Sequence, residues 1–391
     1  MARLGDVFEL QITGEWGNEC SENETGTKVL RTTNFTSEGI INYNDVVVRS
    51  ISEAKIEKKK LHYGDIILEK SGGTEKTPVG RVVFCDEFIE NDTYLCNNFT
   101  QAMRVNKAIA VPKYVFYFMW NLHYSGKTDL LQNKTTGIRN LQVKAYLNED
   151  FYLPSLEEQR KIAAVLDKVS DLITKRRQQL EKLDLLVKAR FVEMFGDPVI
   201  NPKGWEKFTL GKRCDIVTGN TPSRAEPENF GNFIEWIKSD NINTPSMFLT
   251  EAQEYLSEIG FKKCRFVETD SLLMTCIAGS INCIGNVAVT GHRVAFNQQI
   301  NAIVPKRDNV LYLYWLMLLS KPKIHGTINM ALKGILSKGQ LSEMVFPFPP
   351  IELQGQFATF VEQTEKIKTS IRESLTKLQT LKKALMQEYF G

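Results

Sequence analysis

The chain has 391 residues, of which 42% are hydrophobic and 24% are charged, and its formal net charge is +3. This composition is typical of a folded protein of two or three domains and excludes a disordered or fibrous chain. The longest apolar run, at residues 311–319, is about half as long as a bilayer-spanning helix, and the N-terminus has no apolar signal segment. We therefore expect a soluble, cytoplasmic protein.

Cysteine usage and charge distribution narrow the class of protein further. Seven cysteines without a C-x-x-C pair, together with only four histidines, predict neither a disulfide framework nor a metal site. Residues 1–150 carry a net charge of −2 and residues 199–347 carry +3, so neither region is basic enough to identify a nucleic-acid binder. If the partner is DNA, the positive charge must be concentrated on one face.

The first globular region, residues 1–152, has the pattern of a mixed α/β domain with many loops. Short β-rich runs such as residues 65–68 are separated by clusters of Gly, Asn and Ser. The aromatic stretch at residues 114–120 is continuous and interleaved with aliphatic residues. It therefore favours a core helix over a base-stacking platform.

A long helix is predicted in the next segment, residues 153–198. No Pro or Gly occurs between residues 157 and 194, and Pro154-Ser155 provides a stop and cap signal before them. Apolar residues recur at alternating spacings of four and three, which is typical of a seam that packs against another helix. The seam residues are Leu166, Val169, Ile173, Leu180, Leu183 and Val187.

The second globular region, residues 199–347, and the final segment, residues 348–391, repeat this plan. Residues 154–196 and 349–391 align without a gap at an offset of 195, and 14 of the 43 positions are identical. The seam recurs in the second helix at Val361, Ile371, Leu375, Leu378 and Leu385. The two helices are thus expected to pair with each other. The alternative is two separate surface helices that pack on their own domains.

Several motifs resemble the specificity subunit of type I restriction-modification systems. They are the run from Leu153 to Ile162 at the start of the first long helix, its looser copy from Pro349 to Gln354, the stretches at residues 29–34 and 236–242, the turns Ser71-Gly72-Gly73 and Ala278-Gly279-Ser280, and residues 334–337. The segment between Gly137 and Pro154 is two residues longer than its counterpart, and Gly355 replaces Arg160.

This resemblance implies an α+β fold with two target-recognition domains, at residues 1–152 and 199–347. They are separated by a central spacer helix, residues 153–198, and followed by a C-terminal one, residues 348–391. The helices are expected to form an antiparallel coiled coil in a pseudo-two-fold repeat. The family also implies a subunit without a catalytic centre that reads an asymmetric, bipartite site in double-stranded DNA. Two methyltransferase subunits would dock on the helices, restriction subunits would join through them, and S-adenosylmethionine and ATP with magnesium would belong to these partners.

DNA contact requires Arg or Lys for phosphates and guanine, Asn or Gln for adenine, and Gly-rich turns that allow backbone amides to approach phosphate. The candidates in the first region are Arg31, Lys70, Ser71, Gly72, Gly73, Thr74, Lys76, Arg81, Asn98 and Gln101. The candidates in the second are Arg224, Lys238, Ser239, Asn241, Ser280, Asn282, Asn297, Gln298 and Gln299. Each of them is equally compatible with an ordinary loop or turn residue.

Two alternatives from other functional classes remain. One is an interaction scaffold whose helices recruit proteins without reading DNA. The other is an enzyme, either a metal-dependent nuclease built on Asp45, Glu53 and Lys55 or a nucleotide-binding protein built on Lys127. The nuclease residues overlap a charge run that is typical of a solvated face, and Gly126-Lys127-Thr128 lacks the upstream glycine of a phosphate-binding loop.

Overall fold

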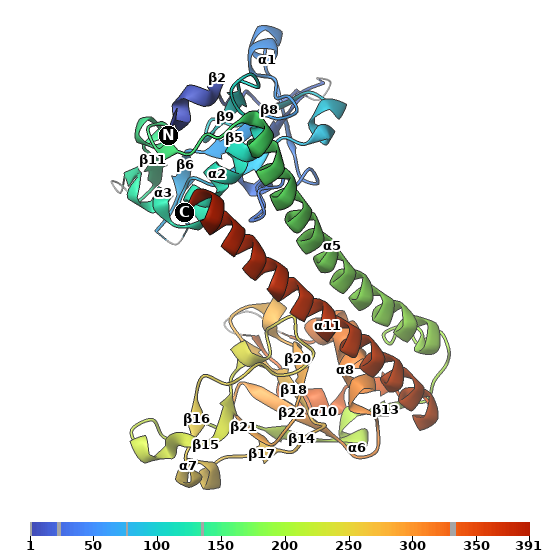
Figure 1. Cartoon of the computed structure of the whole chain (residues 1–391). Helices are drawn as coiled ribbons and strands as arrows, with labels where there is room; N and C mark the ends of the chain where they lie inside the picture. The colour runs from blue at the N-terminus through green and yellow to red at the C-terminus, as the bar shows by residue number, and fades with distance from the viewer. Residues whose placement is uncertain (1, 22–24, 76, 134–136, 329–333) are drawn as a thin grey trace. The chain divides into compact units, whose positions relative to one another are not determined.

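The computed structural model describes residues 2–21, 25–75, 77–133, 137–328 and 334–391. The chain divides into two compact units: unit 1 is Met1–Arg177 with Glu373–Gly391, and unit 2 is Gln178–Arg372. Each unit contains one globular domain and one half of each long helix (Figure 1). Each unit therefore draws on residues that are far apart in the sequence.

The globular part of unit 1 is built on a four-stranded antiparallel sheet in the order β2-β9-β5-β7. Helix α2 covers this sheet, and its residues 114–119 are buried in the core, as the aromatic pattern predicts. A second sheet, β4-β3-β8, contains the parallel pair β3 and β8. The strand bounds are β2 (Phe8–Thr13), β3 (Thr27–Leu30), β4 (Val47–Arg49), β5 (Ile66–Glu69), β7 (Val82–Phe84), β8 (Tyr94–Cys96) and β9 (Thr100–Val105), and α2 is Pro112–Tyr124.

Smaller elements complete unit 1. A three-stranded sheet has the order β10-β11-β6, and β1 pairs with β12. The bounds are β1 (Ala2–Arg3), η1 (Leu4–Val7), η2 (Thr32–Asn34), α1 (Glu53–Lys59), β6 (Ser71–Gly73), η3 (Glu87–Asn91), α3 (Lys127–Leu130), β10 (Gln132–Asn133), β11 (Arg139–Leu141), α4 (Val143–Leu147) and β12 (Asp150–Phe151).

Unit 2 repeats the main sheet of unit 1, and its second sheet, β16-β15-β21-β17, has one strand more than β4-β3-β8. Its main sheet has the order β14-β22-β18-β20, helix α8 corresponds to α2, and β15 pairs in parallel with β21 as β3 does with β8. The strand bounds are β14 (Cys214–Thr218), β15 (Phe230–Ile237), β16 (Tyr255–Leu256), β17 (Phe266–Val267), β18 (Leu272–Thr275), β20 (Val287–Val289), β21 (Val294–Phe296) and β22 (Ile300–Pro305), and α8 is Val310–Leu319. The duplication seen in the helices thus extends through the globular domains.

Two smaller strand pairs of unit 2 also have counterparts in unit 1. Strand β19 pairs with β23 as β6 does with β11, and β13 pairs with β24 as β1 does with β12. The bounds are β13 (Lys207–Thr209), α6 (Leu210–Arg213), η4 (Pro227–Asn229), η5 (Ser239–Asn241), α7 (Glu258–Lys263), β19 (Ile277–Ala278), η6 (Ile281–Cys283), α9 (Lys321–His325), β23 (Gly334–Ile335), α10 (Lys338–Glu343) and β24 (Val345–Pro347).

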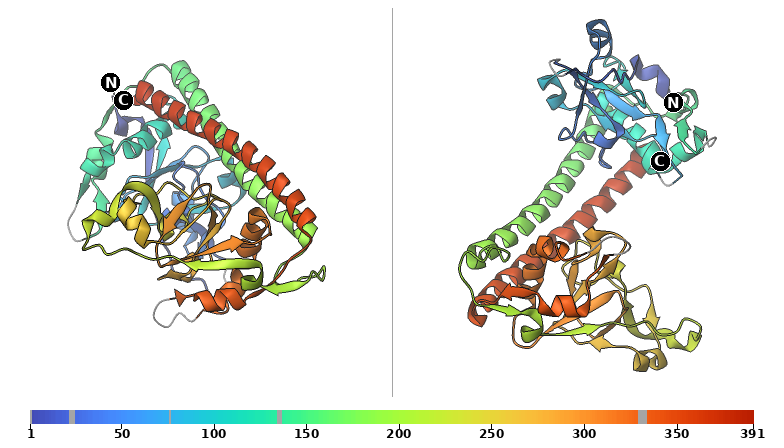
Figure 2. Two further views of the ribbon diagram at one scale, coloured as in Figure 1. Left: turned by 90° about the horizontal axis from the view of Figure 1, so that it is seen from below. Right: turned by 180° about the vertical axis from the view of Figure 1, so that it is seen from behind.

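The two long helices are α5 (Leu156–Phe195) and α11 (Ile351–Phe390). In unit 1, Ile162 and Leu166 of α5 share a core with Met386 and Phe390 of α11. In unit 2, Phe191 of α5 packs on Phe357 of α11, with ring centroids 5.4 Å apart. The low-numbered end of one helix therefore meets the high-numbered end of the other, and the predicted antiparallel pairing is confirmed (Figure 2). All eleven seam residues named above are buried or half-buried.

A buried glutamine anchors the start of each long helix to its domain. The side-chain oxygen of Gln159 accepts from the Val111 amide at 2.8 Å, and its Nε2 donates to the Pro154 carbonyl at 2.8 Å. Gln354 repeats the arrangement with the Asn309 amide at 3.0 Å and the Pro349 carbonyl at 2.9 Å.

Among the described residues, none of the helices combines the length and the apolarity that crossing a membrane requires.

Candidate nucleic-acid interface

In unit 1, the turn at residues 97–99 connects two sheets, because β8 and β9 on either side of it belong to different sheets. The Asn97 amide donates to the Leu30 carbonyl at 2.9 Å. The Phe99 carbonyl accepts from the amides of Lys70 and Ser71 at 2.9 and 3.1 Å. The side chains at the end of β3, in the turn and after β5 are thereby held at one corner of the domain.

Unit 2 has the same set of backbone hydrogen bonds around residues 297–299, and we call this set the frame of the corner. The Asn297 amide donates to the Ile237 carbonyl at 3.0 Å. The Gln299 carbonyl accepts from the amides of Cys276 and Ile277 at 2.8 and 3.1 Å. Arg31 therefore corresponds to Lys238, Asn98 to Gln298 and Phe99 to Gln299.

Another chain segment approaches each turn closely, because a glycine without a side chain lies at the point of contact. A Cβ atom on Gly14 would lie 1.8 Å from the carbonyl oxygen of Asn97, and one on Gly219 would lie 2.2 Å from that of Asn297. No side chain fits at these distances. The segment after Gly14 places Trp16 beside the first turn, and the segment after Gly219 places Thr221 beside the second. We call Trp16, Arg31, Asn98 and Phe99 the unit 1 corner, and Thr221, Lys238, Gln298 and Gln299 the unit 2 corner.

The unit 1 corner surrounds an open hollow of about 440 Å³. Trp16, Arg31, Asn98 and Phe99 line it, and 47% of the Phe99 surface is exposed. The Arg31 guanidinium pairs with Asp45, with Nη2 and Oδ2 2.9 Å apart. The corner thus combines a cation, an amide and an exposed aromatic ring, which are the groups that bind phosphate, base edges and base faces.

The unit 2 corner is more polar. The Thr221 hydroxyl donates to the side chain of Gln298. Lys238 and Arg224 both pair with Glu254, at 2.7 and 2.9 Å, and hydrogen bonding from Lys238 lowers the pKa of this carboxyl group. Arg224 also lies over the ring of Trp236, 5.5 Å from its centroid. Two cations therefore share one carboxylate beside this corner.

The Gly-rich turns lie next to the corners. Ser71, Gly72 and Gly73 form β6, and the Ser71 hydroxyl donates to the Asn140 side chain. Ser280 and Asn282 are exposed on the corresponding segment of unit 2, where the Asn282 carbonyl accepts from Lys321 at 2.6 Å. Lys70 and Ser239 are half-buried, and Thr74 is exposed and hydrogen-bonds with Thr77. Lys76 lies outside the described residues.

Four candidates are held by contacts within the domains. Arg81 forms a double hydrogen bond with the buried Glu69 at 2.7 and 2.9 Å. The buried Gln101 side chain donates to that of Gln11. The Asn241 side-chain oxygen accepts from the Lys238 amide, and that of Asn297 accepts from the Gln299 amide. These side chains position the corners, and the exposed candidates are better placed to meet a ligand.

Trp16, Phe99 and Thr221 are not among the site residues that the sequence predicts. Cations, amides and glycines dominate the predicted set, whereas the aromatic residues discussed above lie in the long apolar runs. Phe99 could have been found, because it follows Asn97-Asn98 in a turn and is not part of an apolar run. Trp16 could not, because its place depends on a backbone contact with residues more than 80 positions away.

The residues of the enzyme alternative are not brought together as a site. Asp45 pairs with Arg31, and Lys55 on α1 pairs with Glu15 at 3.1 Å. Lys127 begins the short helix α3, which follows helix α2, whereas a phosphate-binding loop follows a strand. Within the described ranges, no group of three or more His, Cys, Asp and Glu side chains could hold a metal ion.

Comparison with known proteins identifies this architecture. A family model described as the type I restriction modification DNA specificity domain matches twice, at residues 1–182 and 202–383. A protein of Methanocaldococcus jannaschii, provisionally described as the type I restriction enzyme MjaX specificity subunit, is 21% identical over 98% of this chain and 90% of its own length. The HindI specificity subunit of Haemophilus influenzae is 30% identical over 30% of this chain and 25% of its own length.

Solved structures share the fold. The specificity subunit of a type I restriction-modification system from M. genitalium superimposes with a TM-score of 0.59 and 14% identity, over 100% of this chain and 95% of the other. A chain from a study of complex assembly in the type I system gives a TM-score of 0.53 and 17% identity, over 100% and 96%. With two family matches that span most of its length and a duplicated α+β fold, the chain belongs to the type I restriction-modification DNA specificity family.

Proposed function

We propose that this chain reads a two-part, asymmetric DNA sequence for a type I restriction-modification complex and has no catalytic centre of its own. The observation that carries the proposal is the duplicated corner. Both units build the same hydrogen-bonded frame and display different side chains on it. One frame with two sets of side chains suits two different half-sites.

The corner residues match the chemistry of base and phosphate recognition. Arg31 and Lys238 can contact phosphate or the guanine edge, whereas Asn98 and Gln298 can contact adenine. In the free chain both cations pair with carboxylates, Asp45 and Glu254. DNA phosphates would replace these carboxylates, and binding would weaken as salt concentration rises. Phe99 adds an apolar face in unit 1 that Gln299 does not provide in unit 2.

The long helices support docking of two copies of one partner. Leu172 and Ile367 are equivalent positions at the 195-residue offset, as are Leu186 and Leu381, and all four are exposed by 38%, 53%, 50% and 46%. Each unit carries one member of each pair. Equivalent exposed apolar positions in both units fit two methyltransferase subunits, with restriction subunits bound through them in the cytoplasm. S-adenosylmethionine and ATP with magnesium would bind to those partners.

Mapping of methylated bases in DNA from strains with and without the gene tests the proposal. We expect a gene-dependent site with two specified parts and an unspecified gap. Asn98→Ala should relax only one part and Gln298→Ala only the other, because each mismatch or lost contact typically costs about 1–3 kcal/mol at its own position. Asn148→Ala, at an exposed residue outside the corners, is the control.

A continuous, ungapped site would contradict the two-corner proposal. Gel shifts on random duplexes, with and without the methyltransferase subunit, test the scaffold alternative. Failure to bind any duplex in both conditions would favour a scaffold that recruits proteins without reading DNA.

A further inference from the structure

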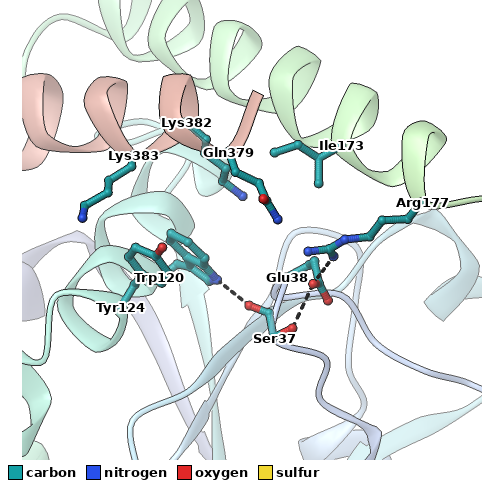
Figure 3. Close-up of a pocket in the computed structure, with 9 residues that line it drawn as sticks. All are labelled: Ser37, Glu38, Trp120, Tyr124, Ile173, Arg177, Gln379, Lys382 and Lys383. Atoms are coloured by element: carbon teal, nitrogen blue, oxygen red, sulfur yellow. Dashed lines mark hydrogen bonds and ion pairs between the residues drawn. The ribbon is translucent and has the colours of Figure 1, made fainter. Parts of the chain in front are cut away.

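A small pocket in unit 1 lies where four segments meet, away from the corner residues. Its volume is about 150 Å³. Helix α11 contributes Gln379, Lys382 and Lys383, and α5 contributes Ile173 and Arg177 (Figure 3). Helix α2 contributes Trp120 and Tyr124, and the loop after η2 contributes Ser37 and Glu38. No part of the proposed DNA reading uses this pocket.

Lys382 occupies a seam position where the first copy has an apolar residue. Its counterpart at the 195-residue offset is Val187, which is buried in the core of unit 2. The Lys382 ammonium lies over two rings, 4.4 Å from the centroid of Trp120 and 5.8 Å from that of Tyr117. Across the described ranges, it forms no ion pair with a carboxylate within 4 Å. A cation thus replaces a core aliphatic residue without an anionic partner.

Lys368, the other lysine in the seam of α11, has carboxylate partners. Lys368 is buried in unit 2, and its ammonium lies 2.6 Å from Asp184 and also pairs with Glu365. Lys382 has only aromatic faces, which compensate less for lost hydration than a carboxylate does. Burial accordingly lowers the pKa of Lys382 to about 8. An anion that entered the pocket would supply the missing partner.

The remaining groups in the pocket define what kind of anion fits. Arg177 pairs with Glu38, so this carboxylate is already engaged, and Lys383 adds an exposed cation at the rim. Trp120 and Tyr124 stack with centroids 4.6 Å apart and an interplanar angle of 14°, and Ile173 lines the same pocket. The pocket therefore combines net positive charge with an apolar wall of two rings and one aliphatic side chain.

We propose that this pocket binds a small carboxylate with a compact apolar body, such as an aromatic acid. The carboxylate would pair with Lys382, and the apolar part would lie against Ile173 and the ring edges of Trp120 and Tyr124. The volume suits this class of ligand, because a cavity of about 150 Å³ accommodates a benzene ring. This inference is independent of the proposed DNA reading and concerns a separate site.

Calorimetry with the full chain and two probes tests the proposal. Benzoate should bind to the wild-type chain, and the uncharged isostere benzamide should not. Lys382→Met should weaken benzoate binding by at least about tenfold, because a hydrogen bond to a charged group is lost. Lys382→Arg should retain binding, since it keeps the charge. Lys377→Met, at an exposed lysine on the same helix, is the matched control and should leave the affinity unchanged.

A second measurement separates a binding site from a packing role. Because Val187 occupies the equivalent position, Lys382→Met should fold and should melt at a higher temperature than the wild type in the absence of ligand. Benzoate should raise the melting temperature of the wild type and leave that of Lys382→Met unchanged. Equal binding of benzamide, equal binding by Lys382→Met, or no binding of benzoate at millimolar concentration would each overturn the proposal.

Discussion

Gly14 and Gly219 are the residues on which the two corners depend most directly. Alanine at either position would place a Cβ within 1.8 or 2.2 Å of a backbone carbonyl oxygen, so the turn must move. We expect Gly14→Ala and Gly219→Ala each to lower the free energy of unfolding by about 1–3 kcal/mol, as overpacking does. Gly14→Ala should disturb recognition of one half-site and Gly219→Ala the other, measured by denaturant unfolding and by methylation mapping.

Gly291→Ala is the matched control for both glycine variants. Gly291 is an exposed residue of unit 2 outside the corners and the Gly-rich turns, and a Cβ there meets nothing within 4 Å. Its stability and methylation pattern should match those of the wild type. A Gly14→Ala variant that is equally stable would show that the two segments do not approach each other so closely.

The lowered pKa of Lys382 predicts how the free energy of unfolding depends on pH. Burial lowers its pKa to about 8, with Arg177 and Lys113 lowering it further and Glu38 and Asp167 opposing the shift. Between pH 8 and the usual lysine range near 10.5, the unfolded chain binds more protons than the folded chain. Stability therefore rises with pH in this window. The stability advantage of Lys382→Met over the wild type should shrink from pH 8 to pH 10 in urea titrations, whereas a constant difference would exclude a lowered pKa.

Gln159 and Gln354 each join a long helix to the start of the helix that covers the sheet of the same unit. Gln354 donates to the Pro349 carbonyl and to Asp308, and accepts from the Asn309 amide. Alanine would leave these buried groups unpaired, at a cost of about 1–3 kcal/mol for each unsatisfied group. We expect Gln354→Ala and Gln159→Ala to be strongly destabilising in thermal unfolding.

Gln356→Ala provides the comparison for these two variants, because Gln356 lies two residues after Gln354 on the same helix and is exposed. Its unfolding temperature should remain that of the wild type. If Gln354→Ala behaved in the same way, the buried hydrogen bonds would not anchor the helix.

The length of the two helices predicts the spacing between the two half-sites in DNA. The boundary between the two units falls within both helices, after Arg177 in α5 and after Arg372 in α11. Four residues inserted at both points would add about 6 Å of helix. If the helices set the distance between half-sites, the unspecified gap should grow by about two base pairs. Methylation mapping of this variant decides the matter, and an unchanged gap would refute the role of the helices as a ruler.

The sequence predicted the helices well because their pattern is local. The region without Pro or Gly at residues 157–194 differs by one residue at each end from α5, and the seam residues are buried or half-buried as expected. The corners could be predicted only in part, because Arg31, Asn98 and Trp16 come together through hydrogen bonds between distant strands and loops. Polar residue type alone could not separate Arg31, at the corner, from Arg81, which is engaged by Glu69.

The shared core of unit 1 has a consequence for synthesis of the chain. Met386 and Phe390 are buried against the first domain, and the Phe390 ring lies 5.2 Å from that of Tyr114. Domains generally fold in order from the N-terminus as they leave the ribosome. Here the first domain to emerge lacks part of its core until the last turns of α11 are translated. A nonsense mutation near residue 385 would therefore damage the N-terminal domain first, although the second domain is closer to it in the sequence.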